Sequence, residues 1–304
     1  MSLLAFLACV IAAGELYCRF SPRFLEEHQD YIREIMNADA KNAVFGDSHV
    51  GYVSRIPGYA FLGFRGQDPE ELLMLVKYLY TYNRPGNIIV IASPQWFGRY
   101  HSENAPVLSE GSLPNRWLPI PLLILSKNFL ASIRANAQAD LLNLAVQAVR
   151  ADEPEQMLDP KAALAILGRM PQGSDWSTVP KDVRFAFTST RVQAHNPTDN
   201  FASSAAAGAY EEALRFLMTR GAKLCLYRTP VTSLYLDLAY RIPGTRFAEF
   251  DDYAAQLASR LGVKRVDFHS LPYSFADRAF ADQDHLLDAS ATELWPLVEQ
   301  ACFH

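Results

Sequence analysis

The sequence contains no run of lysine or arginine residues, and its 304 residues carry a formal net charge of -5 at pH 7. Because a mildly acidic chain without a basic patch does not attract phosphates, we expect no nucleic-acid partner. Internal repeats and low-complexity tracts are also missing, which excludes a repeat architecture. Half of the residues are apolar, which is enough to bury a sizeable core. The composition therefore predicts a globular protein.

Cysteine is scarce, and its spacing matches neither a metal site nor a redox motif. The four cysteines are Cys9, Cys18, Cys225 and Cys302. Cys225 lies in a segment typical of a buried strand, where a free cysteine behaves as a small hydrophobe. We therefore expect no disulfide framework. Histidine spacing gives no metal signal either, so we expect neither a metal nor a cofactor. The histidines considered for this are His101, His195, His269 and His304.

The N-terminal segment at residues 2–14 is apolar and uncharged. It is shorter than the roughly 20 residues that a membrane-spanning helix needs, and it suits the apolar part of a signal peptide better. Residues 15–20 could extend it, with Tyr17 and Arg19 as anchors at the membrane surface. We expect an uncleaved signal anchor at residues 1–20, so that the rest of the chain faces the periplasm or the cell exterior. The alternative is an apolar helix packed on a soluble domain.

Apolar segments of strand length alternate with helical segments along most of the chain. Strands are predicted at residues 42–45, 59–63, 87–92, 223–227 and 263–268. Helices are predicted from Asp68 onward and at residues 205–220, 247–261 and 289–302. Asp68 suits an N-cap and Pro69 the first position of a helix. This alternation predicts an α/β fold, a three-layer α/β/α sandwich with a parallel sheet.

The region at about residues 98–201 departs from this alternation. It contains several prolines, helical segments at about residues 122–150 and 160–167, and polar loops at residues 173–200. We interpret it as a helical insertion or cap on an α/β domain that spans residues 21–304. Its residues are not expected to belong to the core of the sheet domain.

Two polar segments follow the first and last predicted strands. Gly46-Asp47-Ser48 comes directly after the first strand, and Asp282-Gln283-Asp284-His285 lies in the loop after the last one. Because the carboxyl ends of parallel strands meet at one edge of a sheet, these segments should lie together. A serine nucleophile needs a base, and the base needs an orienting group. We predict Ser48 as the nucleophile, His285 as the base and Asp282 as the orienting carboxylate. Asp284 is the less suitable alternative, because it adjoins His285.

The same segments resemble the SGNH/GDSL hydrolase superfamily. Gly46-Asp47-Ser48 matches its nucleophile block, and residues 280–291 look like its final block, with Asp282-x-x-His285 before the last helix. The resemblance covers residues 42 to about 91 and 205–303. It implies an acyl-serine mechanism in which the oxyanion accepts hydrogen bonds from the N–H groups of Ser48 and Gly66, with Gly63 as the less suitable glycine. The Gly-x-Asn-Asp block of the family is missing, and Gln95 is its loose substitute.

This departure, together with the predicted anchor, resembles an envelope-facing subset of the superfamily. The subset includes proteins similar to alginate O-acetyltransferase and to the D-alanyl-lipoteichoic acid transfer protein. It implies O-acetyl transfer to a cell-envelope polysaccharide, an acylated small molecule or polysaccharide as ligand, and a membrane-bound O-acyltransferase as partner. The alternatives are an esterase that uses water and a non-catalytic partner that binds a glycan or an acyltransferase. Arg228, His49 and Trp96 are predicted to bind substrate, whereas Asp47 is predicted to brace the turn.

Overall fold

The computed structural model describes residues 40–50, 55–63, 66–98 and 175–304, and all of them belong to one compact unit. The signal anchor predicted at residues 1–20 lies outside the described residues, as does most of the predicted insertion. No helix within the described ranges is both long enough and apolar enough to cross a membrane.

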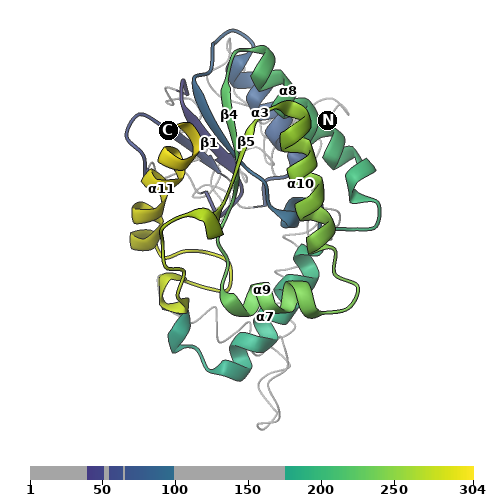
Figure 1. Cartoon of the computed structure of the whole chain (residues 1–304), viewed down its shortest axis with the longest axis vertical. Coiled ribbons are helices and arrows are strands. Elements are labelled where there is room, and N and C mark those ends of the chain that lie inside the picture. Colours follow the sequence, from purple (N-terminus) through teal and green to yellow (C-terminus); the bar gives the residue numbers. More distant parts are fainter. Residues whose placement is uncertain (1–39, 51–54, 64–65, 99–174) are drawn as a thin grey trace, which may run out of the picture. The chain divides into compact units, whose positions relative to one another are not determined.

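Five strands form one parallel sheet in the order β2-β1-β3-β4-β5. Figure 1 labels β1, β4 and β5 of this sheet. The strands are β1 (Ala43–Gly46), β2 (Ala60–Gly63), β3 (Asn87–Ile91), β4 (Lys223–Arg228) and β5 (Lys264–Asp267). Every residue of β1 is buried, and so are all residues of β3 and β4 after the first. Such continuous burial is expected for parallel strands that helices cover on both faces.

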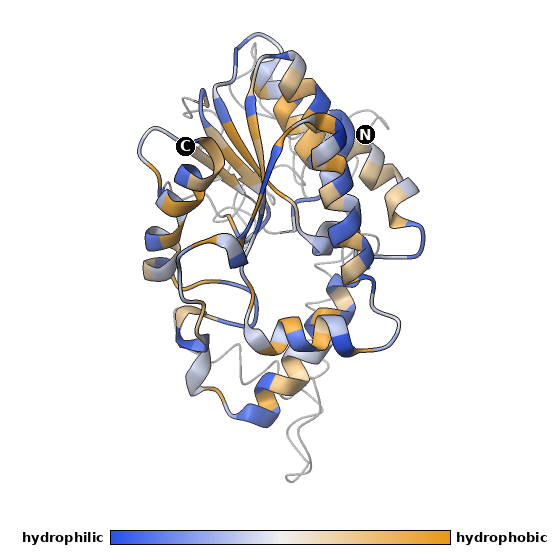
Figure 2. Ribbon diagram, viewed as in Figure 1, coloured by the Kyte–Doolittle hydropathy of each residue, from blue (hydrophilic) through white to orange (hydrophobic). Residues whose placement is uncertain are grey.

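Helices cover both faces of this sheet. On one side lie α3 (Pro69–Tyr80), α8 (Ala205–Thr219) and α10 (Phe247–Leu261), and on the other lies α11 (Asp288–Phe303), as Figure 1 shows. Figure 2 shows apolar residues on the strands and mixed apolar and polar faces on the helices. The predicted three-layer α/β/α fold is therefore confirmed.

The start of α3 shows why this helix forms where it was predicted. Asp68 accepts a hydrogen bond from the backbone N–H of Glu71 at 2.8 Å, and the Glu71 carboxylate accepts one from the Asp68 N–H at 3.0 Å. Pro69 occupies the first turn, where a missing N–H costs nothing. This capping box satisfies two N–H groups that would otherwise lack partners, and replacing such a cap by alanine typically costs about 1 kcal/mol.

The core beneath α11 is built around one tryptophan. Trp295 packs edge-on against Phe61 of β2, with ring centroids 5.1 Å apart, and against Tyr227 of β4 at 5.4 Å. All three side chains are buried. Each large apolar side chain buried in this way stabilises the fold by roughly 1.5–3 kcal/mol. These contacts hold α11, and with it the loop that precedes α11, against the sheet.

A disulfide bond joins Cys225 of β4 to Cys302 of α11, with the Cα atoms 5.7 Å apart. Both cysteines are buried. The prediction of a free Cys225 was therefore wrong. The two residues are 77 positions apart in the sequence, and only the packing of α11 on β4 brings them together.

A helix, α7 (Lys181–His195), lies where the sequence predicted polar loops, so that prediction was also wrong. Its buried residues are few, namely Val183, Thr188, Val192 and His195, and two of them are polar. The hydrophobic pattern is therefore weak. α7 packs against α9 (Ser233–Arg241), a short helix that the sequence analysis did not predict. The described part of the predicted insertion thus contributes a helix, and that helix carries Arg191 and His195.

Candidate active site

Ser48 lies in the tight turn that follows β1. The backbone N–H of Val50 closes this turn by donating to the carbonyl of Asp47 at 3.0 Å. A Cβ atom on Gly46 would lie 2.4 Å from the Val50 side chain and 2.8 Å from Ile91. Only glycine therefore allows the turn to fold back so closely on the end of the strand. The result places Ser48 at the carboxyl edge of the sheet.

The Ser48 hydroxyl lies 2.8 Å from Nε2 of His285. The other ring nitrogen of His285, Nδ1, lies 3.0 Å and 2.9 Å from the two carboxylate oxygens of Asp282. The structure thus brings together the three residues predicted from the sequence, although 237 positions separate Ser48 from His285. If Nδ1 carries the proton toward Asp282, Nε2 is free to accept one from Ser48.

The loop around Asp282 explains this geometry. Its carboxylate accepts hydrogen bonds from the backbone N–H groups of Asp284 at 2.9 Å and of His285 at 2.7 Å. The loop is closed by an N–H of Ala281 that donates to the carbonyl of His285 at 2.8 Å. Asp282 therefore fixes the backbone that carries His285 as well as the orientation of its ring.

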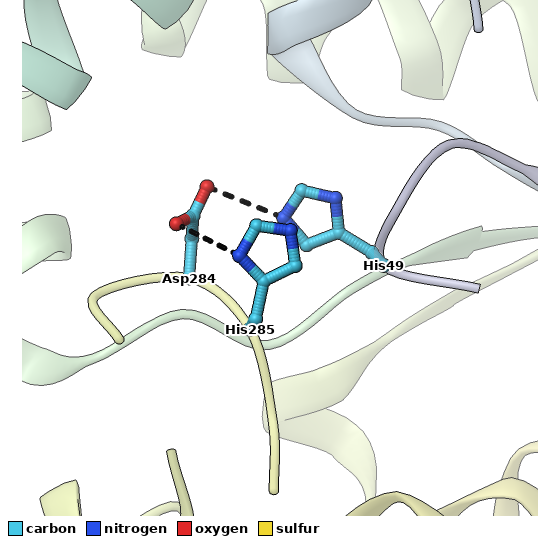
Figure 3. Close-up of side chains that lie close together, drawn as sticks. All are labelled: His49, Asp284 and His285. Carbon is cyan, nitrogen blue, oxygen red and sulfur yellow. Dashed lines mark ion pairs between the residues drawn. The ribbon is translucent and has the colours of Figure 1, made fainter. Parts of the chain in front are cut away.

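Asp284 is a buried carboxylate at the centre of the site, a position that the sequence analysis missed. Its side chain is only 1 % exposed. One oxygen lies 3.4 Å from Nδ1 of His285 and 3.5 Å from Nε of Arg191. The other lies 3.3 Å from Nε2 of His49 and 3.6 Å from Nδ1 of His195. Figure 3 shows the carboxylate facing both His49 and His285.

Of the two carboxylates, Asp282 lies nearer to the His285 ring. Nδ1 of His285 is 2.9 Å from an Asp282 oxygen and 3.4 Å from an Asp284 oxygen. Asp284 instead lies between Arg191 and the rings of His49, His195 and His285. Arg191 and His195 belong to α7. Because the sequence pattern predicted a loop there, it did not indicate that these two residues lie at the site. The Asp-x-Asp-His spacing was the only signal for Asp284, and it did not distinguish a buried from an exposed carboxylate.

The charges of the site shift the pKa values of its groups. Burial lowers the pKa of His285, but the charges of Asp282 and Asp284 outweigh burial and raise the pKa well above its ordinary value. Burial raises the pKa of Asp284, but the charges of Arg191 and His285 outweigh burial and hold it well below its ordinary value. The Asp284 carboxylate is thus ionised at neutral pH, and His285 is held toward its protonated form.

The side chain of His49 is buried beside His285, and its predicted role in substrate binding stays a prediction. Its side chain is 5 % exposed, and Nδ1 lies 2.6 Å from the carboxylate of Asp47. Its ring stacks on the ring of His285, with centroids 4.5 Å apart and planes 13° apart. Burial lowers the pKa of His49, but the Asp47 charge together with hydrogen bonds to Asp284 and Asp47 outweighs burial, and the pKa is raised to about 9.

Gln95 and Gly66 were predicted as donors to the oxyanion. The amide of Gln95, in the 3-10 helix η1 (Pro94–Phe97), donates to the Asp47 carboxylate at 3.0 Å. The same amide nitrogen also lies 3.2 Å from Nδ1 of His49. The role of Gln95 in binding the oxyanion stays a prediction. Gly66 has a φ of 77°, which favours glycine. It follows β2, whose last residue, Gly63, pairs with Gly46 at the end of β1. The loop that carries Gly66 thus starts beside the Ser48 turn.

The other two predicted substrate-binding residues have different surroundings from those expected. The Arg228 guanidinium forms ion pairs with Asp251 of α10 and, at 3.7 Å, with Asp267, and it donates to the Tyr240 hydroxyl at 2.6 Å. Trp96 is 1 % exposed and packs edge-on against Tyr210 at 5.4 Å. Arg228 is therefore a neutralised structural cation, and Trp96 is a core residue.

Within the described ranges, His49, Asp284 and His285 are the one group of three whose metal-ligand atoms lie within 4.8 Å of one another. A metal ion binds an imidazole along the lone pair, which lies in the ring plane. The two rings are nearly parallel, at 13°, so their lone pairs run side by side and do not converge on one ion. This arrangement does not fit a tetrahedral zinc site.

Neither a protein-family model nor a curated protein matches this chain. Among solved structures, it is similar to a protein provisionally named a platelet activating factor from Streptococcus pneumonia, at 12 % identity and a TM-score of 0.44, over 92 % of this chain and 94 % of the other. A second similar structure is a provisionally named acylhydrolase from Bacteroides fragilis, at 12 % identity and a TM-score of 0.40, over 90 % and 94 %.

Proposed function

We propose that this protein is an SGNH-type serine acyl-transfer enzyme. The observation that carries the proposal is the continuous chain of contacts from the Ser48 hydroxyl through His285 to Asp282, at 2.8 Å and 2.9 Å. Such contacts are within the range that a nucleophile, a base and an orienting group require. Their place at the carboxyl edge of a parallel sheet is where such folds hold their ligands.

In the proposed reaction, Ser48 Oγ attacks the carbonyl carbon of an ester donor while His285 Nε2 accepts the hydroxyl proton. The bond from the carbonyl carbon to the donor oxygen breaks, and His285 returns the proton to that oxygen. An acyl-Ser48 ester results. An acceptor hydroxyl then attacks this ester and gives its proton to His285, which passes it to Ser48 as the acyl group leaves. Backbone N–H groups of Ser48 and Gly66 would stabilise the oxyanion in both steps.

The favoured acceptor is a hydroxyl of a cell-envelope polysaccharide, which makes the protein an O-acetyltransferase beside a membrane-bound O-acyltransferase. The apolar segment at residues 2–14 supports an envelope location. The buried Cys225–Cys302 disulfide supports it independently, because disulfides persist in oxidising compartments and are rare in the cytosol. Both features are expected of a protein anchored to the membrane and facing the periplasm or the cell exterior.

A second candidate function is an esterase, in which water replaces the glycan hydroxyl. It is favoured by the exposure of the site, because the side chains of His285 and Asp282 are 25 % and 28 % exposed. Water therefore has access to an acyl group on Ser48. A transferase must outcompete this water with a well-placed acceptor, whereas an esterase uses it directly.

The proposal is tested with 4-nitrophenyl acetate as donor and purified protein as catalyst. We expect release of 4-nitrophenol that Ser48→Ala abolishes and that Ser203→Ala leaves intact, since Ser203 is exposed and bonds only the carbonyl of Asn200. Addition of envelope polysaccharide should move the acetyl group onto the glycan, as mass spectrometry would detect. Release of acetate alone would favour the esterase. Equal activity of Ser48→Ala and wild type would contradict both enzyme functions and leave the non-catalytic binding partner.

A further inference from the structure

Both ring nitrogens of His49 face a carboxylate. Nδ1 lies 2.6 Å from an oxygen of Asp47, and Nε2 lies 3.3 Å from an oxygen of Asp284. A neutral imidazole carries one N–H, so its second nitrogen would direct a lone pair at a negative oxygen. Only the protonated ring offers an N–H to each carboxylate. The geometry thus fits an imidazolium held between two anions.

The chain contains a second Asp-x-His turn that serves as a comparison. In Asp267-Phe268-His269, the His269 N–H donates to the Asp267 carboxylate at 3.1 Å, and Nδ1 lies 2.9 Å from the same oxygen. Asp47-Ser48-His49 has the same pattern, at 3.0 Å and 2.6 Å. The His269 side chain, however, is 59 % exposed. The turn itself is therefore ordinary, and burial together with Asp284 distinguishes His49.

The groups around His49 come from several elements. They are Asp47 and Gln95, Asp284 and His285 in the loop before α11, and, through Asp284, Arg191 and His195 of α7. His195 lies 2.9 Å from the Tyr235 hydroxyl, and burial lowers its pKa to about 3, so it is neutral. A small cavity beside His49 is lined by Asp284 and by uncharged residues that include Tyr227 and Trp295.

Three carboxylates, those of Asp47, Asp282 and Asp284, therefore face two cations at neutral pH, Arg191 and a protonated His49. When His285 is neutral, the group carries one excess negative charge. When His285 has accepted the Ser48 proton, the group is neutral. Without the charge on His49, the carboxylates would hold the proton on His285 to a still higher pH, so that less His285 would be free to accept the proton of Ser48.

We propose that His49 is a positioning residue for the Ser48 reaction: its imidazolium neutralises Asp284 and, stacked on His285, opposes premature protonation of that base. The inference rests on the proposed function, because His285 needs to be neutral only if it serves Ser48. The stacking distance of 4.5 Å is short enough for the two charges to interact strongly within a buried site. His49 itself does not contact the reacting atoms in this account.

Two variants separate the charge of His49 from its hydrogen bonds. His49→Asn places an amide near the position of Nδ1 and keeps a donor to Asp47, whereas His49→Gln places one near Nε2 and keeps a donor to Asp284. Neither carries a charge. The matched control is His269→Asn, which alters the same kind of turn at an exposed place. We expect both His49 variants to lose about 10-fold in kcat/KM at pH 7 and to recover at alkaline pH, because the base then loses its proton anyway. His269→Asn should keep the wild-type pH profile.

Histidine ring resonances in NMR spectra report the protonation states of His49 and His285, and this measurement does not require catalytic activity. In the wild-type protein, we expect His49 to stay protonated until about pH 9. In His49→Asn and His49→Gln, His285 should hold its proton to a higher pH than in the wild type. A neutral His49 at pH 7, or an unchanged His285 titration in folded variants, would overturn the inference. If the wild type has no turnover at all, the proposed function fails, and the spectra still decide the charge of His49.

Discussion

Breaking the Cys225–Cys302 disulfide should destabilise the protein while leaving its fold in place. The cysteines are 77 positions apart, so the bond closes a long loop in the unfolded chain. The chain-entropy model assigns about 4.5 kcal/mol at 25 °C to a loop of this length, and removal of native disulfides typically costs about 2–5 kcal/mol. The remaining contacts of α11, including those of Trp295 with Phe61 and Tyr227, should keep the helix on the sheet.

The assay is unfolding by guanidinium chloride in a background where Cys9 and Cys18 are replaced by serine, so that one pair of cysteines remains. The oxidised protein, the same protein reduced before unfolding, and a Cys225→Ala/Cys302→Ala variant are compared. We expect lower midpoints for the last two, with the reduced protein as the cleaner comparison because it keeps both sulfur atoms. Two free thiols in the unfolded, unreduced protein, or equal midpoints for the oxidised and reduced forms, would refute the reasoning.

Three further predictions concern the site. Asp282→Asn should lower kcat by on the order of 10³–10⁴-fold, because an amide no longer orients the His285 ring. Asp284→Asn should lower kcat less. Steady-state kinetics compare the two variants, and a larger loss in Asp284→Asn would reverse the assignment of roles. Because the pKa of His285 is raised, the fraction of neutral His285 increases only as pH rises through that pKa. A pH–rate profile should therefore show kcat/KM increasing above neutral pH. A rate that falls from pH 7 upward would contradict this. Gly46→Ala should destabilise the fold by about 1–3 kcal/mol in denaturant unfolding, because its Cβ would overlap Val50, and an unchanged midpoint would contradict this.

Most of the sheet could be predicted from the sequence because β1, β2 and β3 are nearly all apolar and β4 has an apolar centre. Each of the five strands lies within a residue or so of its predicted place, as in Ile88 to Ile91 of β3. Asp68 and Pro69 likewise marked the start of α3, and α10 lies at the predicted residues 247–261. These patterns involve residues close together in the sequence, so they can be recognised without the tertiary structure.

The features that the sequence did not reveal depend on contacts between distant residues. α7 buries the polar residues Thr188 and His195, so its amphipathic pattern is weak. Asp284 is a core residue only because Arg191 and three histidine rings surround it. The sequence shows that His49 lies close to Asp47, but it does not show that the His49 side chain is buried against His285. Pattern and spacing thus located the three residues of the proposed triad, whereas the charged groups around them could be identified only in the packed structure.

Covalent trapping of the nucleophile tests the central claim most directly. The wild-type protein is treated with a fluorophosphonate at pH 8, and the modified peptide is identified by mass spectrometry. The account predicts a single adduct on Ser48, absent in Ser48→Ala and much slower to form in His285→Gln, while both variants keep the wild-type circular dichroism. A folded wild-type protein that forms no adduct, or forms one on another residue, would contradict the assignment of Ser48 and His285 as nucleophile and base.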